Sequence, residues 1–311
     1  FIDWISPPDH LNFNRSLFSA LHSTNSLCYV FHKKLLIQEA NCRYIKSQNS
    51  RFIRFLDVLK IFLMSKKEKI IFITYDPLFL PIFSFFNVNL TVYEHNTVPE
   101  MINFNKHAIW QKLMFGKVKR MAQFKGQYDN LKKLKQNVFY VGSPISIAGI
   151  AERSRASDFK YYIAPNYRTN LDNIKKMIPF LHSKEKIIVK TAVWKNSKVR
   201  SKFFIHEEYI NIKENFNNIC GIIISIESRV RGSGWFNEAI TFGFPIIIPN
   251  KESVKLFKEN FPRYPFIDLT IATTKKSFKE QLLRNSKFCS KKFIERNNLS
   301  FRENFLYISK K

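Results

Sequence analysis

The sequence predicts an α/β protein of two domains, each built on a parallel sheet, with the two sheets facing a cleft. Short apolar runs of strand length alternate with longer stretches of helical period, which is typical of open α/β domains. The alternation occurs in both halves of the 311-residue chain. A chain of this length also suits two domains of ordinary size.

The first half contains four predicted strands. Continuous apolar runs suit strands that are buried on both faces of a parallel sheet, and proline or glycine ends the first and last of them. The runs are Phe1 to Ile5, Ile70 to Thr74, Leu90 to Tyr93 and Asn137 to Val141. Between them, Phe52 to Met64 has apolar residues at helical spacing.

The second half repeats this order after the polar, aperiodic stretch Glu152 to Asp158. We therefore expect a first domain at 1–150 and a second at 151–311. The strands expected in the second domain are Tyr161 to Ala164, Lys186 to Lys190, Gly221 to Ile226 and Ile246 to Ile248. The helices expected there are Asn170 to Leu181, Asn237 to Phe242, Ser253 to Asn260 and basic segments from Ser277 onward.

The charge balance indicates attraction to polyanions. The formal net charge is +27, and basic residues are concentrated in Lys106 to Lys135 and in Lys275 to Lys311. Such a field attracts nucleic acid, anionic lipid or phosphorylated small molecules. A generally basic, solvated surface explains the same excess, so charge alone does not choose the partner.

Cysteine usage and hydropathy bear on the compartment. The cysteines are Cys28, Cys42, Cys220 and Cys289. They form no CxxC pair, so we expect neither a zinc site nor a disulfide framework and favour the reducing cytoplasm. The most apolar stretch, Ile70 to Phe86, is interrupted by charge and proline and is shorter than the roughly 20 residues of a membrane span. The chain begins at Phe1, so a removed leader stays open.

The segment Gly221 to Ile248 is the most informative about function. A buried strand leads into a polar loop, and Gly232-Ser233-Gly234 then precedes a short helix that includes Glu238. Gly243 is expected to cap the end of this helix. Such a helix start offers backbone N–H groups to an anion such as a diphosphate, and Glu238 lies where its carboxylate can reach ribose hydroxyls. A glycine capping loop with Glu238 as a surface acid is the alternative.

Residues Asn237 to Ile247 resemble the Glu-Ala-x-x-x-Gly-x-Pro-Val-Ile segment of GT-B glycosyltransferases, especially the group 1 (GT4-like) family. The resemblance implies a GT-B fold of two Rossmann-like domains, with a nucleotide-sugar donor bound to the second. It implies that Glu238 holds the ribose and that Gly232 to Trp235 line the donor pocket, with Asn237 beside them.

The catalytic candidates are Glu227 and His95. The family has a glutamate eight residues before its ribose-binding one, where this chain has Val230. Glu227 is the nearest acid and substitutes only if the loop is longer, so the retaining outcome stays open. GT-B enzymes often bring a histidine or acid to the sugar from a first-domain loop, and His95 follows a predicted strand there as a base or hydrogen-bond partner. For His95, a purely structural role remains the alternative. Asp9 and His10, which follow the first strand, are further candidates.

The predicted diphosphate-binding cations follow two strands of the second domain. Pro165 to Leu171 is similar to the family loop that ends in Lys-Asn-Leu, with Thr169 in the place of the lysine. Arg168 is adjacent and has the bidentate geometry that a diphosphate favours. Lys190 and Lys195 follow the next strand. Each cation is also explained as a surface charge.

These observations together predict a glycosyltransferase that moves a sugar from a nucleoside-diphosphate donor to a glycan or lipid-linked acceptor in surface polysaccharide synthesis. No metal or cofactor is expected, because GT-B enzymes offset the leaving diphosphate with cations and helix dipoles and no Asp-x-Asp motif is present.

Other functions fit parts of the pattern. A nucleotide-sugar 2-epimerase suits the same architecture, and a basic, aromatic-rich chain suits a non-enzymatic RNA-binding protein. No RNA-binding motif is found, so no nucleic-acid partner is expected. Apolar and basic residues interleave in Lys106 to Lys135. That pattern predicts a segment that rests peripherally on an anionic inner membrane, or an ordinary amphipathic helix packed on the sheet.

Overall fold

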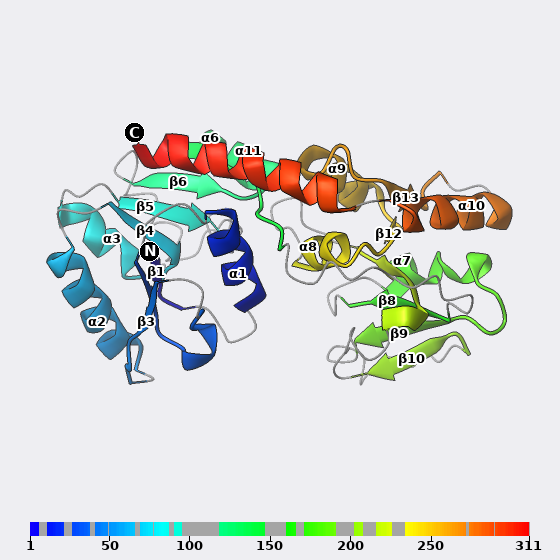
Figure 1. Ribbon diagram of the computed structural model, residues 1–311, viewed down its shortest axis with the longest axis horizontal. Coiled ribbons are helices and arrows are strands. Elements are labelled where there is room, and N and C mark those ends of the chain that lie inside the picture. The colour runs from blue at the N-terminus through cyan, green and yellow to red at the C-terminus, as the bar shows by residue number, and fades with distance from the viewer. Residues whose placement is uncertain are drawn as a thin grey trace. The chain divides into compact units, whose positions relative to one another are not determined.

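The chain divides into two compact units (Figure 1). The computed structural model describes residues 1–5, 11–21, 27–37, 41–48, 50–65, 69–76, 78–86, 90–94, 118–146, 160–165, 171–190, 202–207, 216–225, 234–271, 274–288 and 290–310. Unit 1 comprises Phe1–Ser146 together with Asn297–Lys311, and unit 2 comprises Ile147–Arg296.

Unit 1 is built on a seven-stranded parallel sheet in the order β3-β2-β1-β4-β5-β6-β7. Its strands are β1 (Ile2–Asp3), β2 (Cys28–Val30), β3 (Cys42–Tyr44), β4 (Ile70–Thr74), β5 (Leu90–Glu94), β6 (Lys119–Ala122) and β7 (Val138–Tyr140). All residues of β4 and β5 are buried, which agrees with the continuous apolar runs of the sequence. Strands β2, β3 and β6 were not predicted.

Both faces of this sheet are covered by helices, because successive side chains of a strand point to opposite faces. Along β4, Ile70 and Phe72 join a core with helices α2 (Arg51–Met64) and α3 (Leu80–Phe83). Ile71 and Ile73 join a second core with helices α1 (Leu11–Ala20) and α11 (Ser290–Lys310). The 3-10 turns η2 (Lys33–Leu35) and η3 (Ser84–Phe86) complete the connections.

The C-terminal end of α11 belongs to unit 1. Phe301, Phe305 and Ile308 are buried in the core shared with β2 and β4. The Asn298 side chain accepts a hydrogen bond from the Ile145 N–H at 2.9 Å and donates one to the Ile145 carbonyl at 2.7 Å. Residues 297–311, which the expected boundary assigned to the second domain, therefore complete unit 1, because their apolar face covers a sheet that residues 1–146 leave partly bare.

Unit 2 has a six-stranded parallel sheet in the order β10-β9-β8-β11-β12-β13. Its strands are β8 (Tyr161–Ala164), β9 (Lys186–Lys190), β10 (Phe204–Glu207), β11 (Ile219–Ile223), β12 (Ile246–Ile248) and β13 (Phe266–Asp268). Its helices are α7 (Leu171–Lys175), α8 (Gly234–Thr241), α9 (Lys251–Asn260) and α10 (Lys275–Ser286), with 3-10 turns η4 (Ile178–Phe180) and η5 (Phe216–Asn218). Strands β8, β9 and β12 match their predicted bounds.

Close packing inside this sheet depends on Gly221 of β11. A Cβ atom built there would lie 2.8 Å from the carbonyl oxygen of Pro245, and the same carbonyl accepts the Ile222 N–H at 2.9 Å. Only a residue without a side chain permits this approach. Gly221 therefore sets the pairing of β11 with β12.

The basic stretch Lys106 to Lys135 does not form one amphipathic helix. Within residues 118–135, Lys119 to Ala122 are strand β6 and helix α6 (Lys125–Lys133) follows. Arg120 and Met121 are fully buried in this strand. Across the described part of the chain, no helix has both the length and the apolar character needed to cross a membrane.

Candidate functional site

Helix α8 holds most of the predicted donor-site residues that the structure describes. Phe236, Ala239 and Ile240 are buried on one side of this helix, and the Phe236 ring packs 5.0 Å from that of Phe257 in α9. By helical spacing Glu238 falls on the opposite side and Asn237 on the flank of the helix, and both residues are half-buried. The pattern leaves the Glu238 carboxylate out of the core.

The end of α8 has the geometry that the sequence predicted. Gly243 has φ +66°, a left-handed conformation that glycine adopts without strain. The Gly243 N–H donates to the Ile240 carbonyl at 3.2 Å and the Phe244 N–H to the Ala239 carbonyl at 2.9 Å. These two bonds form a Schellman motif. The expected cap at Gly243 is confirmed, and it directs the chain into β12.

A polar cluster lies at the carboxyl edge of the unit 2 sheet, around Ser225. Ser225 follows β11 and is fully buried. Its hydroxyl oxygen accepts hydrogen bonds from the side-chain amides of Asn173 at 3.1 Å and Asn250 at 2.6 Å. The exposed Lys176 ammonium donates to the Asn173 amide oxygen at 2.9 Å and to the Pro249 carbonyl at 3.2 Å. The cluster joins α7 to the ends of β11 and β12.

The same cluster orients the start of α9. The Asn250 side-chain oxygen accepts the Ser253 N–H at 2.7 Å and so caps the helix. Its amide nitrogen is thereby turned toward Ser225. Asn173 of α7 and Asn250 at the start of α9 therefore share one polar cluster at the carboxyl ends of the strands. This edge is where open α/β sheets bind ligands.

Some of the other predicted site residues are described by the structure, and the rest lie outside its described part. Lys190 is the last residue of β9 and is half-buried at the carboxyl edge, and Gly234 and Trp235 form the first turn of α8. The predicted residues that lie outside the described part of the chain are Asp9, His10, His95, Arg168, Lys195, Glu227, Gly232 and Ser233.

In unit 1, a buried polar cluster follows β1 and β4. Asp3 is 1% exposed. Its carboxylate accepts hydrogen bonds from the Asn14 amide and from the Thr74 hydroxyl, each at 2.6 Å, and the Ile5 N–H donates to the Thr74 hydroxyl oxygen at 3.0 Å. These contacts set the direction in which the chain leaves β1.

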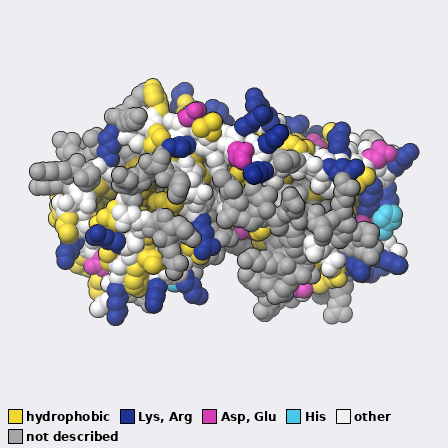
Figure 2. All heavy atoms as spheres, viewed as in Figure 1, with side chains coloured by type: hydrophobic (Ala, Val, Ile, Leu, Met, Phe, Trp, Pro, Cys, Tyr) yellow, Lys and Arg dark blue, Asp and Glu magenta, His cyan; other side chains and the backbone are white. Residues whose placement is uncertain are grey.

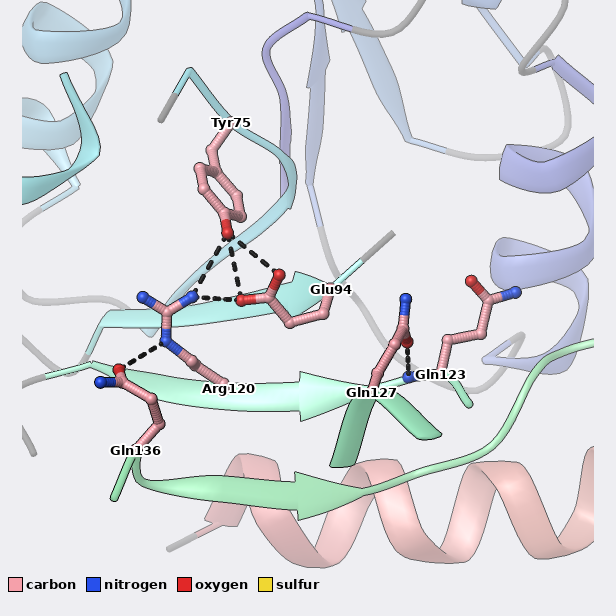
Figure 3. A network of polar contacts seen from close by, with 6 residues as sticks. All are labelled: Tyr75, Glu94, Arg120, Gln123, Gln127 and Gln136. Carbon is pink, nitrogen blue, oxygen red and sulfur yellow. Dashed lines mark hydrogen bonds and ion pairs between the residues drawn. The ribbon is translucent and has the colours of Figure 1, made fainter. Parts of the chain in front are cut away.

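A second buried network fixes the end of β5, one residue before His95 (Figure 3). Glu94 and Arg120 are both fully buried and form an ion pair. The Tyr75 hydroxyl lies 3.0 Å and 3.1 Å from the two Glu94 carboxylate oxygens, and the Arg120 Nε donates to Gln136 at 3.0 Å. Burial alone would lower the pKa of Arg120, but Glu94 and Tyr75 outweigh burial and raise it, so the guanidinium stays charged.

A separate group of contacts holds the start of α6. The Gln127 side-chain oxygen accepts the N–H groups of Gln123 and Phe124, both at 3.0 Å. The Gln123 amide nitrogen donates to the Ser143 hydroxyl at 2.7 Å. In Figure 3 these side chains lie beside β6, so one strand links both groups of contacts.

Sequence reasoning missed the Ser225 cluster and the Glu94–Arg120 pair. Ser225 and Asn250 had a detectable signal. Ser225 is a polar residue inside the apolar run Gly221 to Ile226, and Asn250 follows the run Ile246 to Ile248 and precedes a helical pattern. Arg120 had none, since a basic residue among other basic residues does not indicate burial. Among the described residues, no group of three or more His, Cys, Asp or Glu side chains is placed to hold a metal ion.

No protein-family model and no curated protein matches this sequence. Among solved structures, the chain is similar to HepE from Anabaena. The crystal structure of HepE in complex with UDP and glucose aligns over 99% of this chain and 93% of that chain, with TM-score 0.61 and 10% identity. The HepE complex with UDP-glucose aligns over 100% and 96%, with TM-score 0.60 and 10% identity.

At this identity the likeness concerns the fold. The two parallel-sheet α/β domains predicted from the sequence are confirmed, and the fold is that of the GT-B glycosyltransferases.

Proposed function

We propose that this chain is a glycosyltransferase that moves a sugar from a nucleoside-diphosphate donor to a glycan or lipid-linked acceptor. The observation that supports this most is helix α8, which presents Glu238 outside the core after the carboxyl edge of a parallel sheet. The start of a helix at such an edge favours the binding of a diphosphate. An acidic residue one turn into the helix can then bind the ribose hydroxyls.

Other features support the same donor site. The Glu238 to Ile247 segment resembles the donor-binding segment of GT-B enzymes, and the fold is similar to that of HepE, whose crystal structures contain UDP and UDP-glucose. In the proposed site Glu238 binds the ribose hydroxyls, and Gly232 to Trp235, with Asn237 beside them, surround the diphosphate and sugar. Arg168 and Lys190 supply positive charge.

The proposed transfer uses protein groups alone. Cations and helix N-termini offset charge on the leaving diphosphate, in keeping with the absence of an Asp-x-Asp motif in the sequence. His95 and Glu227 are the proposed catalytic residues. We further propose that the reaction takes place on the cytoplasmic side and contributes to surface polysaccharide synthesis.

Nucleotide binding tests the donor site directly. We expect UDP, GDP or another nucleoside phosphate to raise the melting temperature, whereas an RNA oligonucleotide does not. Glu238→Ala removes hydrogen bonds to a charged acceptor worth about 1.5–3 kcal/mol, so the Kd of the stabilising nucleotide should rise roughly 10- to 150-fold. Calorimetric titration measures this change.

The matched control is Glu280→Ala, which removes an exposed acid from α10 of the same unit and should leave the Kd unchanged. Unchanged binding by Glu238→Ala would show that the donor site is misplaced. If no nucleoside diphosphate stabilises the folded chain, the transferase proposal fails. Interconversion of a nucleotide sugar without an acceptor would instead show the epimerase.

We also propose peripheral contact with an anionic membrane, where lipid-linked acceptors are presented. On α6 the Lys125 and Lys132 ammonium groups lie 4.5 Å and 5.5 Å from the centre of the Tyr128 ring. On α2, Phe52 and Met64 are 57% and 77% exposed to solvent. Figure 2 shows Lys and Arg side chains beside hydrophobic ones on the visible surface, and interfacial binding combines buried apolar area with attraction of basic groups to anionic lipid. Equal sedimentation with phosphatidylglycerol and phosphatidylcholine vesicles would reject this contact.

A further inference from the structure

Cys28 and Cys42 face each other across two neighbouring strands of unit 1. Cys28 is the first residue of β2 and Cys42 is the first residue of β3, and the two are paired in register. The Cys28 N–H donates to the Asn41 carbonyl at 2.9 Å, which holds the amino ends of both strands together. Paired strands lie about 4.7–4.9 Å apart, within the roughly 4.4–6.8 Å Cα separation that a disulfide accepts. Both cysteines are free thiols.

The two thiols differ in access and in acidity. Cys28 is fully buried, whereas Cys42 is partly exposed. The Cys28 thiol donates a hydrogen bond to Cys42, and the Ile37 N–H donates a further one, so the pKa of Cys42 is lowered to about 7 against the opposing effects of burial and Asp3. The hydrogen bond with Cys42, together with burial, raises the pKa of Cys28 well above its ordinary value.

These differences assign separate roles. The thiolate is the form of cysteine that attacks oxidants, so the more exposed and more acidic thiol reacts first. The second thiol is held next to it and is shielded from reagents in solution. This is the arrangement of a reactive cysteine beside a resolving cysteine.

We propose that Cys42 and Cys28 form an oxidant-responsive pair, in which Cys42 reacts with hydrogen peroxide and Cys28 then closes a reversible disulfide. The Cys42 thiolate attacks one peroxide oxygen, the O–O bond breaks, and hydroxide leaves with sulfenic acid on Cys42. The Cys28 sulfur displaces the sulfenic oxygen, which takes up the Cys28 proton and leaves as water. Two thiols have then lost two electrons to one peroxide, and an external dithiol returns them.

The location of the pair indicates what the bond changes. β3 is the edge strand of the sheet and pairs only with β2 among the described strands. The disulfide would join this edge covalently to its neighbour. Both cysteines stand at the amino ends of their strands, the opposite edge from Asp3 and Glu94, so the proposal does not depend on the transferase activity.

Peptide mapping of the whole chain after brief treatment with hydrogen peroxide tests the pair. We expect one Cys28–Cys42 linked peptide that dithiothreitol reverses, with Cys220 and Cys289 still reduced. In Cys28→Ala we expect Cys42 to stay as a sulfenic acid that dimedone captures. Loss of the hydrogen bond should also slow alkylation of Cys42 at pH 7 roughly threefold, because a smaller thiolate fraction is partly offset by higher nucleophilicity.

Two further variants separate this chemistry from a general effect of cysteine removal. Cys220→Ala removes the buried cysteine of unit 2 and should leave disulfide formation unchanged. Cys42→Ser should leave Cys28 reduced under the same treatment, because that thiol is buried. Over-oxidation of Cys42 in the wild-type chain without a linked peptide would overturn the proposal, as would equal alkylation rates in wild type and Cys28→Ala.

Discussion

The buried ion pair between Arg120 and Glu94 offers a sharp test of what holds unit 1 together. Arg120→Met replaces the guanidinium with an apolar chain and leaves the Glu94 carboxylate buried without its cation. Both side chains are 0% exposed, so the solvent cannot compensate. Removing one partner of such a pair costs about 3–5 kcal/mol.

Hydrogen exchange measures this loss strand by strand. A loss of 3–5 kcal/mol corresponds to roughly two to four orders of magnitude in the opening equilibrium, so amides of β5 and β6 should exchange faster by about that factor. The peptide that contains β12 in unit 2 is the internal control and should exchange at its original rate.

The double variant Glu94→Gln with Arg120→Met separates charge from packing. It removes both charges, and the Tyr75 hydroxyl still has an amide oxygen within reach, so we expect at least half of the lost protection to return. If Arg120→Met alone changes exchange in β5 by less than tenfold, or if the double variant is worse than either single variant, the pair does not stabilise unit 1 as argued.

Two further predictions concern unit 2. Gly221→Ala places a Cβ atom against the Pro245 carbonyl and should cost about 1–3 kcal/mol by overpacking, measured as lost exchange protection in β11 and β12; an unchanged β12 would refute the close approach. Asn250→Ala removes the cap of α9 and a donor to Ser225 and should cost about 1–2 kcal/mol in urea unfolding, whereas Asn250→Asp, which keeps the capping oxygen, should recover part of it.

The central strands could be predicted from the sequence because burial on both faces demands apolar residues without interruption. Ile70 to Thr74, Tyr161 to Ala164 and Lys186 to Lys190 have the predicted bounds. The edge strands β3 and β10 were not predicted, because their side chains are half-buried or exposed. Such strands need no continuous apolar run, so their sequences do not stand out. Strand β6 escaped because Arg120 is compatible with burial only through Glu94, and sequence alone does not show that pairing.

The candidate site was predictable to the extent that it lies in one continuous segment. The turn at Gly243 and the half-buried position of Glu238 follow from the local pattern of residues around α8. The Ser225 cluster combines side chains from three segments separated by 52 and 25 residues. Its assembly depends on which strands are neighbours, and that order emerges only from the fold.

The chain path through α11 has a consequence for synthesis on the ribosome. Domains generally fold as units as they emerge, and unit 2 is one continuous segment that is complete at Arg296. Synthesis of unit 1 begins before that of unit 2, yet the core of unit 1 lacks Phe301, Phe305 and Ile308 until residues 297–311 are made. At about 5–20 residues per second, the interval between the synthesis of Ser146 and that of Ile308 is on the order of 10–30 s. Unit 1 is therefore begun before unit 2 and completed after it, and its half-covered sheet is the nascent surface that chaperones would meet.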